Sequence, residues 1–439
     1  PLHTPKERKR THRTMNTGLD STGAAEHDAI VTQSSWLDRL ARRLVLSRLE
    51  KLQVGRVVIT ERDEQFVFGC STPEFPTTAE IRVINPKFYS TTAFGGSVGA
   101  GEAYIHGYWE CGDLSELLRI LISNREVLEE MDSGLAWLSS PLQKAFHALN
   151  RNTRRGSRKN ISAHYDLGND FYQLWLDPSM MYSCAYFDTP DTPLDAAATA
   201  KLDRICRKLN LDEQDSVIEI GTGWGGFAIH AAKHYGCHVT TTTISQQQHD
   251  FAKQAISDAG LEDRVTLLFC DYRDLEGSFD KLVSIEMIEA VGHEYHDTYF
   301  KKCCDLLKPD GQMLLQAITI ADQRYDQYKT GVDFINRYIF PGGCLTSVTD
   351  MSRTLTRHTD MRVIHLEDIG PHYARTLRHW HNRFLARIDE VRELGYSDTF
   401  IRMWQFYLAY CESAFIERAI GDVQMLIMRP GARCEDVRY

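Results

Sequence analysis

Glycines at alternating positions follow a short apolar segment near the middle of the chain. Residues 216–220 are mostly apolar and include Glu219; Gly221 and Gly223 come directly after them, and residues 227–232 favour a helix. Strand, glycine-rich turn and helix form the first unit of a nucleotide-binding α/β sheet. Glycine lets the backbone approach a ligand closely, and the helix N-terminus offers free N–H groups. The segment predicts a ligand site, with an ordinary βα turn as the alternative.

The spacing of the glycines narrows the class of ligand. The turn has the pattern G-x-G-x-G-G over residues 221–226 and not the dinucleotide pattern G-x-G-x-x-G. With Glu219 two residues before the first glycine, it resembles the first motif of the class I S-adenosylmethionine-dependent methyltransferases. That resemblance implies a Rossmann-like sheet.

The elements around this turn alternate between helix and strand, which predicts an α/β fold with a mostly parallel sheet. A helix is expected over 196–208, and residues 379–419 are expected to be helical. Strands are expected over residues 216–220, 239–244, 265–270, 282–285, 312–317 and 423–428, with a turn at 308–311 before the fifth of them.

The region before the sheet has a different pattern. Residues 36–52 carry apolar side chains at helical spacing, and residues 54–92 contain three short β-like segments at 57–60, 65–68 and 79–84. The helix either packs on its own domain or lies on a membrane surface. Its apolar stripe consists of Leu37, Leu40, Leu44, Val45, Leu49 and Leu52.

Four segments are expected along the chain. They are a disordered segment over 1–33, a small α+β domain over 34–140, a basic linker over 141–160 and a methyltransferase domain over 161–439. Within the last of these, about 320–390 form an insertion whose aromatic content suits either a helical cover over a lipid site or a role in core packing. The basic linker is either solvated or contacts anionic lipid headgroups.

Composition excludes several classes of function. The formal net charge of -10 argues against a general nucleic-acid binder. No segment is apolar and long enough for a membrane span or a signal peptide. The 11 cysteines form no C-x-x-C pair, which indicates a reduced, cytoplasmic protein. Residues 293–296 lack the H-E-x-x-H spacing, so no metal site is expected.

From about residue 54 onward the chain resembles the cyclopropane-fatty-acyl-phospholipid synthase family. The resemblance rests on many motifs in the same order. They are residues 99–104 and 107–111, His164-Tyr165-Asp166-Leu167-Gly168-Asn169-Asp170, Tyr182-Ser183-Cys184-Ala185-Tyr186, 223–226, Asp271-Tyr272-Arg273-Asp274, Tyr338-Ile339-Phe340-Pro341 and Gly370-Pro371-His372-Tyr373.

The resemblance implies S-adenosylmethionine and a bound bicarbonate ion, which serves as the base. The residues implied for the cofactor are Tyr182, Ser183, Gly221 and Gly223 near its amino-acid part and sulfonium, Thr243, Ile244 and Gln248 near the ribose, and Asp271, Tyr272 and Arg273 around the adenine. The residues implied to hold bicarbonate are Cys184, Glu289, Gln316, Ile318 and Tyr373.

Three residues depart from the family pattern. Ala290 and Gln316 stand where well-known members have histidine, and Glu286 stands where they often have glycine. Glutamine can donate to an anion but cannot carry charge or relay a proton. Methyl transfer is therefore expected, whereas ring closure is open to question.

The resemblance implies an enzyme that adds a one-carbon unit to unsaturated acyl chains of membrane phospholipids and forms cyclopropane fatty acids. The alternatives are a C-methyltransferase giving methyl- or methylene-branched lipids, a small-molecule methyltransferase, and a lipid-binding protein without activity. The expected location is cytoplasmic, peripherally associated with the inner face of the membrane, and a homodimer is the expected assembly.

Overall fold

The computed structural model describes residues 35–133, 152–153, 156–157, 160 and 167–433. The predicted disordered segment 1–33 lies outside the described residues, as does most of the predicted basic linker 141–160.

A four-stranded sheet with the order β2-β1-β3-β4 organises the first part of the chain. The three β-like segments seen in the sequence form β1–β3, with β1 antiparallel to β2 and parallel to β3. The elements are α1 (Trp36–Leu49), β1 (Gly55–Glu61), β2 (Glu64–Cys70), β3 (Thr78–Val83), α2 (Lys87–Ile105), β4 (Trp109–Cys111), α3 (Leu114–Ser123) and α4 (Arg125–Ser133).

Helix α1 uses only part of its predicted apolar stripe for packing. Val45 and Leu49 are buried as expected, and Ala41 is buried with them. Leu37 and Leu40 are instead 39% and 46% exposed. The helix begins after Ser35, whose side chain accepts a hydrogen bond from the Asp38 N–H in a capping box.

A seven-stranded sheet with the order β10-β11-β9-β8-β5-β6-β7 organises the rest. Strands β5–β9 pair in parallel and β11 is antiparallel to both of its neighbours, which confirms the predicted α/β class. The strands are β5 (Ser216–Ile220), β6 (His238–Thr243), β7 (Val265–Phe269), β8 (Phe279–Ile285), β9 (Leu307–Ile320), β10 (Arg362–Asp368) and β11 (Ile420–Met428).

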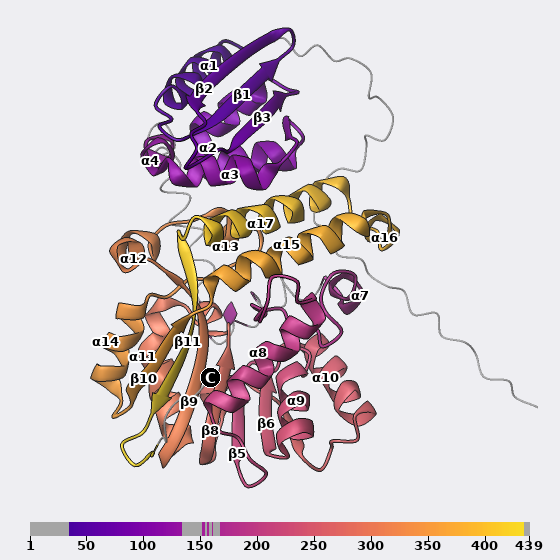
Figure 1. The fold of residues 1–439 in the computed structure, drawn as a ribbon, viewed down its shortest axis with the longest axis vertical. Helices are drawn as coiled ribbons and strands as arrows, with labels where there is room; N and C mark the ends of the chain where they lie inside the picture. Colours follow the sequence, from indigo (N-terminus) through magenta and orange to yellow (C-terminus); the bar gives the residue numbers. More distant parts are fainter. Residues whose placement is uncertain (1–34, 134–151, 154–155, 158–159, 161–166, 434–439) are drawn as a thin grey trace, which may run out of the picture. The chain divides into compact units, whose positions relative to one another are not determined.

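Helices cover both faces of this sheet (Figure 1). The first group comprises α8 (Leu194–Lys208), α9 (Gly226–Tyr235) and α10 (Gln246–Asp258), and the second comprises α11 (His296–Leu306) and α14 (Val348–His358). Because β5 is covered on both faces, residues 217–220 are all buried. Such burial explains why this strand is a continuous apolar segment and does not alternate.

One predicted boundary is wrong. Residues 308–311, expected as a turn, lie inside β9. Phe279 of β8 pairs with Leu307, but Lys281 pairs with Gln312, so the extra residues of β9 interrupt the ladder as an irregularity. The proline and glycine of this segment therefore mark a break in register and not the end of a strand.

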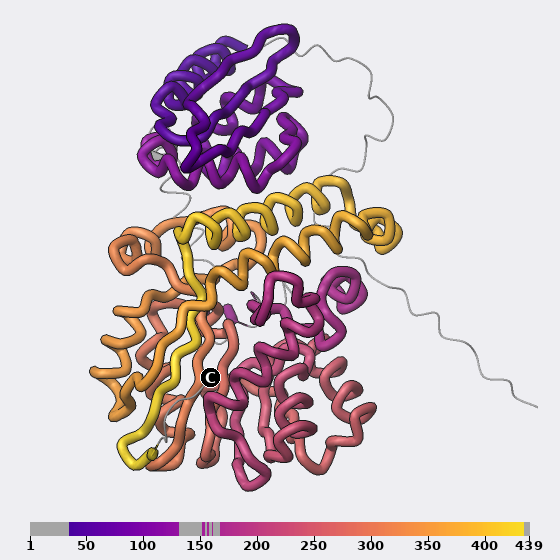
Figure 2. Tube along the Cα trace, viewed as in Figure 1, coloured from indigo at the N-terminus to yellow at the C-terminus, as the bar shows by residue number. Residues whose placement is uncertain are grey.

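Six further α-helices of the described residues complete the second part of the chain. Helices α15 (Gly370–Ala386) and α17 (Asp398–Ile416) run side by side and are joined through α16 (Ile388–Glu393), as the tube in Figure 2 shows. The short helices α12 (Asp322–Tyr328) and α13 (Phe334–Tyr338) precede them in the sequence, and α7 (Asn169–Gln173) precedes the sheet. These helices fit the helical character predicted for residues 379–419.

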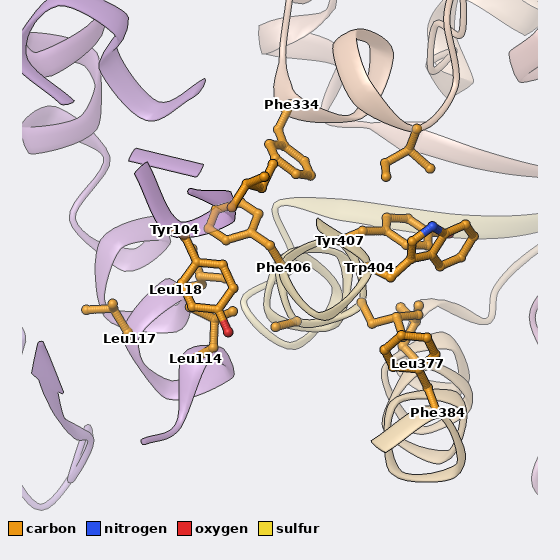
Figure 3. Close-up of a cluster of buried hydrophobic side chains, with 14 of the residues drawn as sticks. Tyr104, Leu114, Leu117, Leu118, Phe334, Leu377, Phe384, Trp404, Phe406 and Tyr407 are labelled. Carbon is orange, nitrogen blue, oxygen red and sulfur yellow. The ribbon is translucent and has the colours of Figure 1, made fainter. Parts of the chain in front are cut away.

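Helix α17 packs aromatic side chains on two sides. Phe406 points toward Tyr104 of α2 and Phe334 of α13, with ring centroids 5.7 and 4.6 Å away (Figure 3). Trp404 points away from these rings, and its centroid lies 4.8 Å from that of Phe171. One helix therefore contributes to the cores around α2 and around α7.

Among the helices of the described ranges, none has the length and apolar character needed to cross a membrane.

Candidate active site

A cavity of about 530 Å³ opens where β5–β8 end and α15 and α17 cover the sheet. The carboxyl ends of parallel strands are the usual ligand position in such sheets. All ten residues that the resemblance assigns to the cofactor line this cavity. They are Tyr182, Ser183, Gly221, Gly223, Thr243, Ile244, Gln248, Asp271, Tyr272 and Arg273.

The glycine turn folds tightly against β6. The N–H groups of Gly221 and Thr222 donate to the Thr242 carbonyl at 3.2 and 2.9 Å. Gly221 has φ +99°, and a Cβ there would lie 3.0 Å from Cγ of Met287. The buried hydroxyl of Thr222 has no hydrogen-bond partner among the described residues. The turn thus combines an exposed backbone with a polar group in need of a partner, which fits a polar cofactor.

We expect Gly221→Ala to lower the affinity for S-adenosylmethionine by at least about tenfold, since the new methyl group strains the turn and displaces Met287. Isothermal titration calorimetry would measure the change. Gly260→Ala is the matched control, because Gly260 also has a positive φ but its Cβ would meet no atom within 4 Å. Equal affinity losses in both variants would contradict a specific role for Gly221.

Two hydrogen-bonded pairs shape the cofactor side of the cavity. The Arg273 guanidinium donates to both carboxylate oxygens of Asp271, at 2.8 and 2.7 Å. The Thr243 hydroxyl donates to Oε1 of Gln248 at 2.9 Å. The Asp271 oxygens retain lone pairs that could accept from an amine. These contacts fix the side chains that the resemblance places around adenine and ribose.

The Glu286 carboxylate is the centre of the hydrogen bonds on the other side of the cavity. Its Oε1 accepts from the Cys184 N–H at 2.8 Å and from Nε2 of Gln316 at 2.7 Å. Its Oε2 accepts from the Tyr373 hydroxyl at 2.7 Å. Three of the five residues expected to hold bicarbonate therefore hold a carboxylate of the protein itself.

The other two residues expected to hold bicarbonate, Glu289 and Ile318, are hydrogen-bonded to each other. The Ile318 N–H donates to Oε1 of Glu289 at 2.5 Å. Glu289, Ile318 and Tyr373 line the cavity, whereas Cys184 and Gln316 are fully buried behind its wall. With their donors directed to Glu286 and Glu289, these residues do not fit a bound bicarbonate.

The backbone at Glu286 has a conformation that is unusual for a residue with a side chain. Its φ is +47°, in the left-handed region that glycine adopts without strain. Strained backbone of this kind persists where the surrounding structure holds it in place. The position directly after β8 thus carries a side chain on a backbone conformation that favours glycine.

Two further buried titratable groups, Lys201 and Asp422, interact with the Glu286 carboxylate. Lys201 of α8 is fully buried, and its Nζ donates to the Ser183 hydroxyl at 2.8 Å. Burial lowers the pKa of Lys201, while Glu286 opposes that effect. Asp422 of β11 accepts from Nε2 of Gln316 at 3.1 Å. Burial and then the Glu286 charge raise the pKa of Asp422 well above its usual range, so Asp422 is the protonated member of the pair.

Glu289 is also a buried acid. Burial, followed by the charge of Glu286, raises the pKa of Glu289 to about 8. Its Oε2 is buried without a hydrogen-bond partner among the described residues. Glu289 is therefore mostly protonated at pH 7, and it lines the cavity.

This pKa predicts a pH dependence of stability. Between about pH 5 and about pH 8 the folded chain keeps a proton on Glu289 that the unfolded chain has released, so the free energy of unfolding falls as pH rises. Glu289→Gln cannot ionise, and its free energy of unfolding should fall less over that interval. Urea unfolding at about pH 5.5 and about pH 8.5 measures the difference.

The control for this comparison is Glu276→Gln, because Glu276 is exposed. It should follow the wild-type pH dependence. A Glu289→Gln variant whose free energy of unfolding falls in parallel with that of the wild type would show that Glu289 is ionised in the folded protein.

Sequence reasoning missed the two buried titratable residues Lys201 and Asp422, and it noted Glu286 only as a departure. A signal for Lys201 was present, because it interrupts the apolar face formed by Ala197, Ala198, Leu202 and Ile205 on the predicted helix. Asp422 gave no comparable signal, since it stands just before the apolar segment taken as the last strand.

Comparison with known proteins identifies relatives of this chain. A family model described as mycolic acid cyclopropane synthetase matches residues 152–425. Cyclopropane-fatty-acyl-phospholipid synthase of Escherichia coli is 39% identical over 80% of this chain and 88% of its own length. Tuberculostearic acid methyltransferase of Mycobacterium tuberculosis is 38% identical over 76% of this chain and 80% of its own length.

Solved structures agree with this relationship. Mycolic acid cyclopropane synthase CmaA1, in a complex with SAH and CTAB, is 30% identical, with a TM-score of 0.58 over 62% of this chain and 98% of that protein. Cyclopropane synthase MmaA2 of Mycobacterium tuberculosis is 28% identical, with the same TM-score and coverage. The cavity at the ends of β5–β8 therefore lies in an S-adenosylmethionine-dependent methyltransferase, and the chain belongs to the mycolic acid cyclopropane synthetase family.

Proposed function

We propose that this enzyme adds a one-carbon unit from S-adenosylmethionine to a double bond in the acyl chains of phospholipids, and that Glu286 is the base of the reaction. The observation that carries the proposal is the Glu286 carboxylate, which three donors hold in the wall of the cavity that contains the glycine turn. The relatives that modify fatty acyl chains support the choice of substrate.

The residues that would hold the cofactor divide into three groups around the cavity. Gly221, Gly223, Tyr182 and Ser183 would bind its amino-acid part, Thr243, Ile244 and Gln248 its ribose, and Asp271, Tyr272 and Arg273 its adenine. When bound, S-adenosylmethionine supplies an electrophilic methyl group. The rest of the chemistry depends on the residues opposite the glycine turn.

An alkene needs no activated nucleophile on the protein, because its own electron pair forms the new carbon–carbon bond. Methylation leaves a carbocation on the acyl chain, which becomes a neutral product only by losing a proton. The Glu286 carboxylate can accept that proton. The Cys184 thiol is not suited to the task, since burial raises its pKa well above the usual range. A mostly apolar cavity protects the cation from water.

Two products are compatible with this proton loss, and both add CH₂ to the lipid. Loss of a proton from the new methyl group with bond formation to the neighbouring cationic carbon gives a cyclopropane ring. If a hydride first moves from the methylated carbon to its cationic neighbour, loss of a proton from the methyl group gives a methylene branch. Glu286 accepts from Cys184, Gln316 and Tyr373, which the resemblance assigns to bicarbonate in ring-forming members, and on this difference we propose the methylene branch.

The test is to incubate the protein with S-adenosylmethionine and vesicles of dioleoylphosphatidylglycerol, and to examine the lipids by mass spectrometry and proton NMR. We expect a gain of CH₂ and olefinic signals of a =CH₂ group. Cyclopropane proton signals at high field would show instead that the product is the ring. No gain with vesicles, together with methylation of a free small molecule, would overturn the proposed lipid substrate.

A phospholipid substrate implies that the enzyme works at a membrane surface, and we propose peripheral association with the inner face of the cytoplasmic membrane. Cosedimentation with vesicles would test it, and recovery of all protein in the supernatant during turnover would oppose it. A homodimer stays a prediction that light scattering can examine.

A further inference from the structure

The catalytic cavity extends well beyond the cofactor and Glu286. Its wall includes apolar residues of α3 and α4, of α17, and of the segment containing α12 and α13. Together these residues form an apolar region with the character of an acyl-chain site. They are Leu118, Leu121, Ile122, Leu128, Tyr328, Ile335, Phe406, Tyr410 and Ala414.

Two arginines line the same cavity from separate elements. Arg125 begins α4 and Arg324 lies in α12, and both side chains are half-buried. They are close enough to influence one another, because burial and then the charge of Arg324 lower the pKa of Arg125. Two cations facing one apolar cavity are unfavourable unless an anion joins them.

The protein supplies no such anion from the described residues. Neighbouring arginines are paired: Arg119 with Glu417 at 2.7 Å and Arg337 with Glu102 at 2.6 Å. By contrast, neither Arg125 nor Arg324 forms an ion pair with any carboxylate in the described ranges. Glu129 also lines the cavity and attracts Arg125. It is exposed and makes no hydrogen bond to that arginine within the described part of the chain.

We propose that Arg125 and Arg324 bind the phosphate of the phospholipid whose acyl chain occupies the apolar part of the cavity. The inference rests on the proposed function, and it adds the group that the enzyme recognises outside the acyl chain. A guanidinium matches phosphate with two parallel hydrogen bonds, and a phosphodiester has two unesterified oxygens that two arginines can share. Recognition of this group selects acyl chains carried by a phospholipid over those of an uncharged glyceride.

The experiment compares Arg125→Gln, Arg324→Gln and the double variant on two substrates in neutral detergent micelles. One is dioleoylphosphatidylglycerol and the other is dioleoylglycerol, which has the same acyl chains without phosphate. We expect each single variant to raise KM for the phospholipid about tenfold with little change in kcat, and to leave KM for dioleoylglycerol unchanged. Arg56→Gln and Arg357→Gln are the controls, since both arginines are exposed and outside the cavity.

A binding measurement separates this inference from the proposed function. Calorimetric titration with a saturated short-chain phosphatidylglycerol, which cannot react, should show about tenfold weaker binding for each variant. If the wild type modifies no lipid, the proposed function fails, while this titration still tests the arginines. Parallel changes of KM for both substrates, or unchanged phospholipid binding, would overturn the inference. Sodium oleate serves as the third ligand, and an equal loss of its binding would assign the arginines to a carboxylate instead.

Discussion

Glu286→Gln should lower kcat for lipid modification by about 10²- to 10⁴-fold, the usual contribution of a positioned general base. Glutamine has nearly the same size, and its one oxygen can still accept from the Cys184 N–H and the Gln316 amide, while its NH₂ group can donate to the Tyr373 oxygen. It cannot take a proton from the cationic intermediate. The affinity for S-adenosylmethionine should stay unchanged, because the glycine turn lies on the other side of the cavity. Steady-state kinetics and calorimetry on the same preparation measure both quantities.

The Glu286→Gly variant tests more specifically whether the Glu286 carboxylate is the base. Removal of the side chain frees the Cys184 N–H, the Gln316 amide and the Tyr373 hydroxyl together, and glycine accepts the φ of +47° without strain. We expect the variant to be inactive alone and to regain activity as bicarbonate is added. Wild-type activity should not respond to bicarbonate.

The controls distinguish loss of the base from loss of structure. Glu276→Gln alters an exposed glutamate and should keep wild-type kinetics. If Glu286→Gln retains wild-type kcat, or if wild-type turnover depends on bicarbonate, Glu286 is not the base. Unchanged urea unfolding of the Glu286→Gly variant would show that the rescue acts on chemistry and not on folding.

Lys201→Met should cost about 3–5 kcal/mol of folding stability, the range found when one partner of a buried charge pair is removed. Lys201 is fully buried, and its charge interacts with Glu286, Asp177 and Asp422. Methionine fills a similar volume but leaves these acidic groups uncompensated. The free energy of unfolding in urea at pH 7 measures the loss, with the exposed Lys253→Met as control.

Two further measurements connect this stability effect to the site. Asp177→Asn combined with Lys201→Met should lose less stability than the sum of the two single variants, because the pair is coupled. Burial raises the pKa of Glu286 and the Lys201 charge opposes that rise, so removal of the charge should move the acidic limb of the kcat profile to higher pH. Additive stability losses with an unmoved pH profile would show that Lys201 acts only by packing.

The features that local sequence determines were predictable. A mostly apolar segment located β5, because a strand buried on both faces needs apolar side chains at successive positions, and the β-branched residues 239–243 located β6. The residues expected to bind the cofactor were named from the family resemblance, and the strand order explains why most of them lie together. Gly221 follows β5, Thr243 ends β6 and Asp271 lies two residues after β7, and the ends of parallel strands meet at one edge.

The features that depend on distant pairs were not predictable. The partners of Glu286 are Cys184, Gln316 and Tyr373, which lie 102, 30 and 87 residues away in the sequence. No local sequence pattern indicates that these donors form hydrogen bonds with a glutamate rather than with a free anion. The same applies to Arg125 and Arg324, which share a cavity only because α4 and α12 line it together.

The position of β11 has a consequence for how the enzyme matures on the ribosome. This strand lies between β9 and β10, and it brings Asp422 and Gln424 to the Gln316 side chain. Synthesis reaches it only after α12–α17 and β10, so the nascent chain carries two open strand edges until then. Gln316 also lacks its final neighbours during this period. Catalytic competence should therefore appear late in translation, and chains stalled before residue 420 would need chaperones to protect those edges.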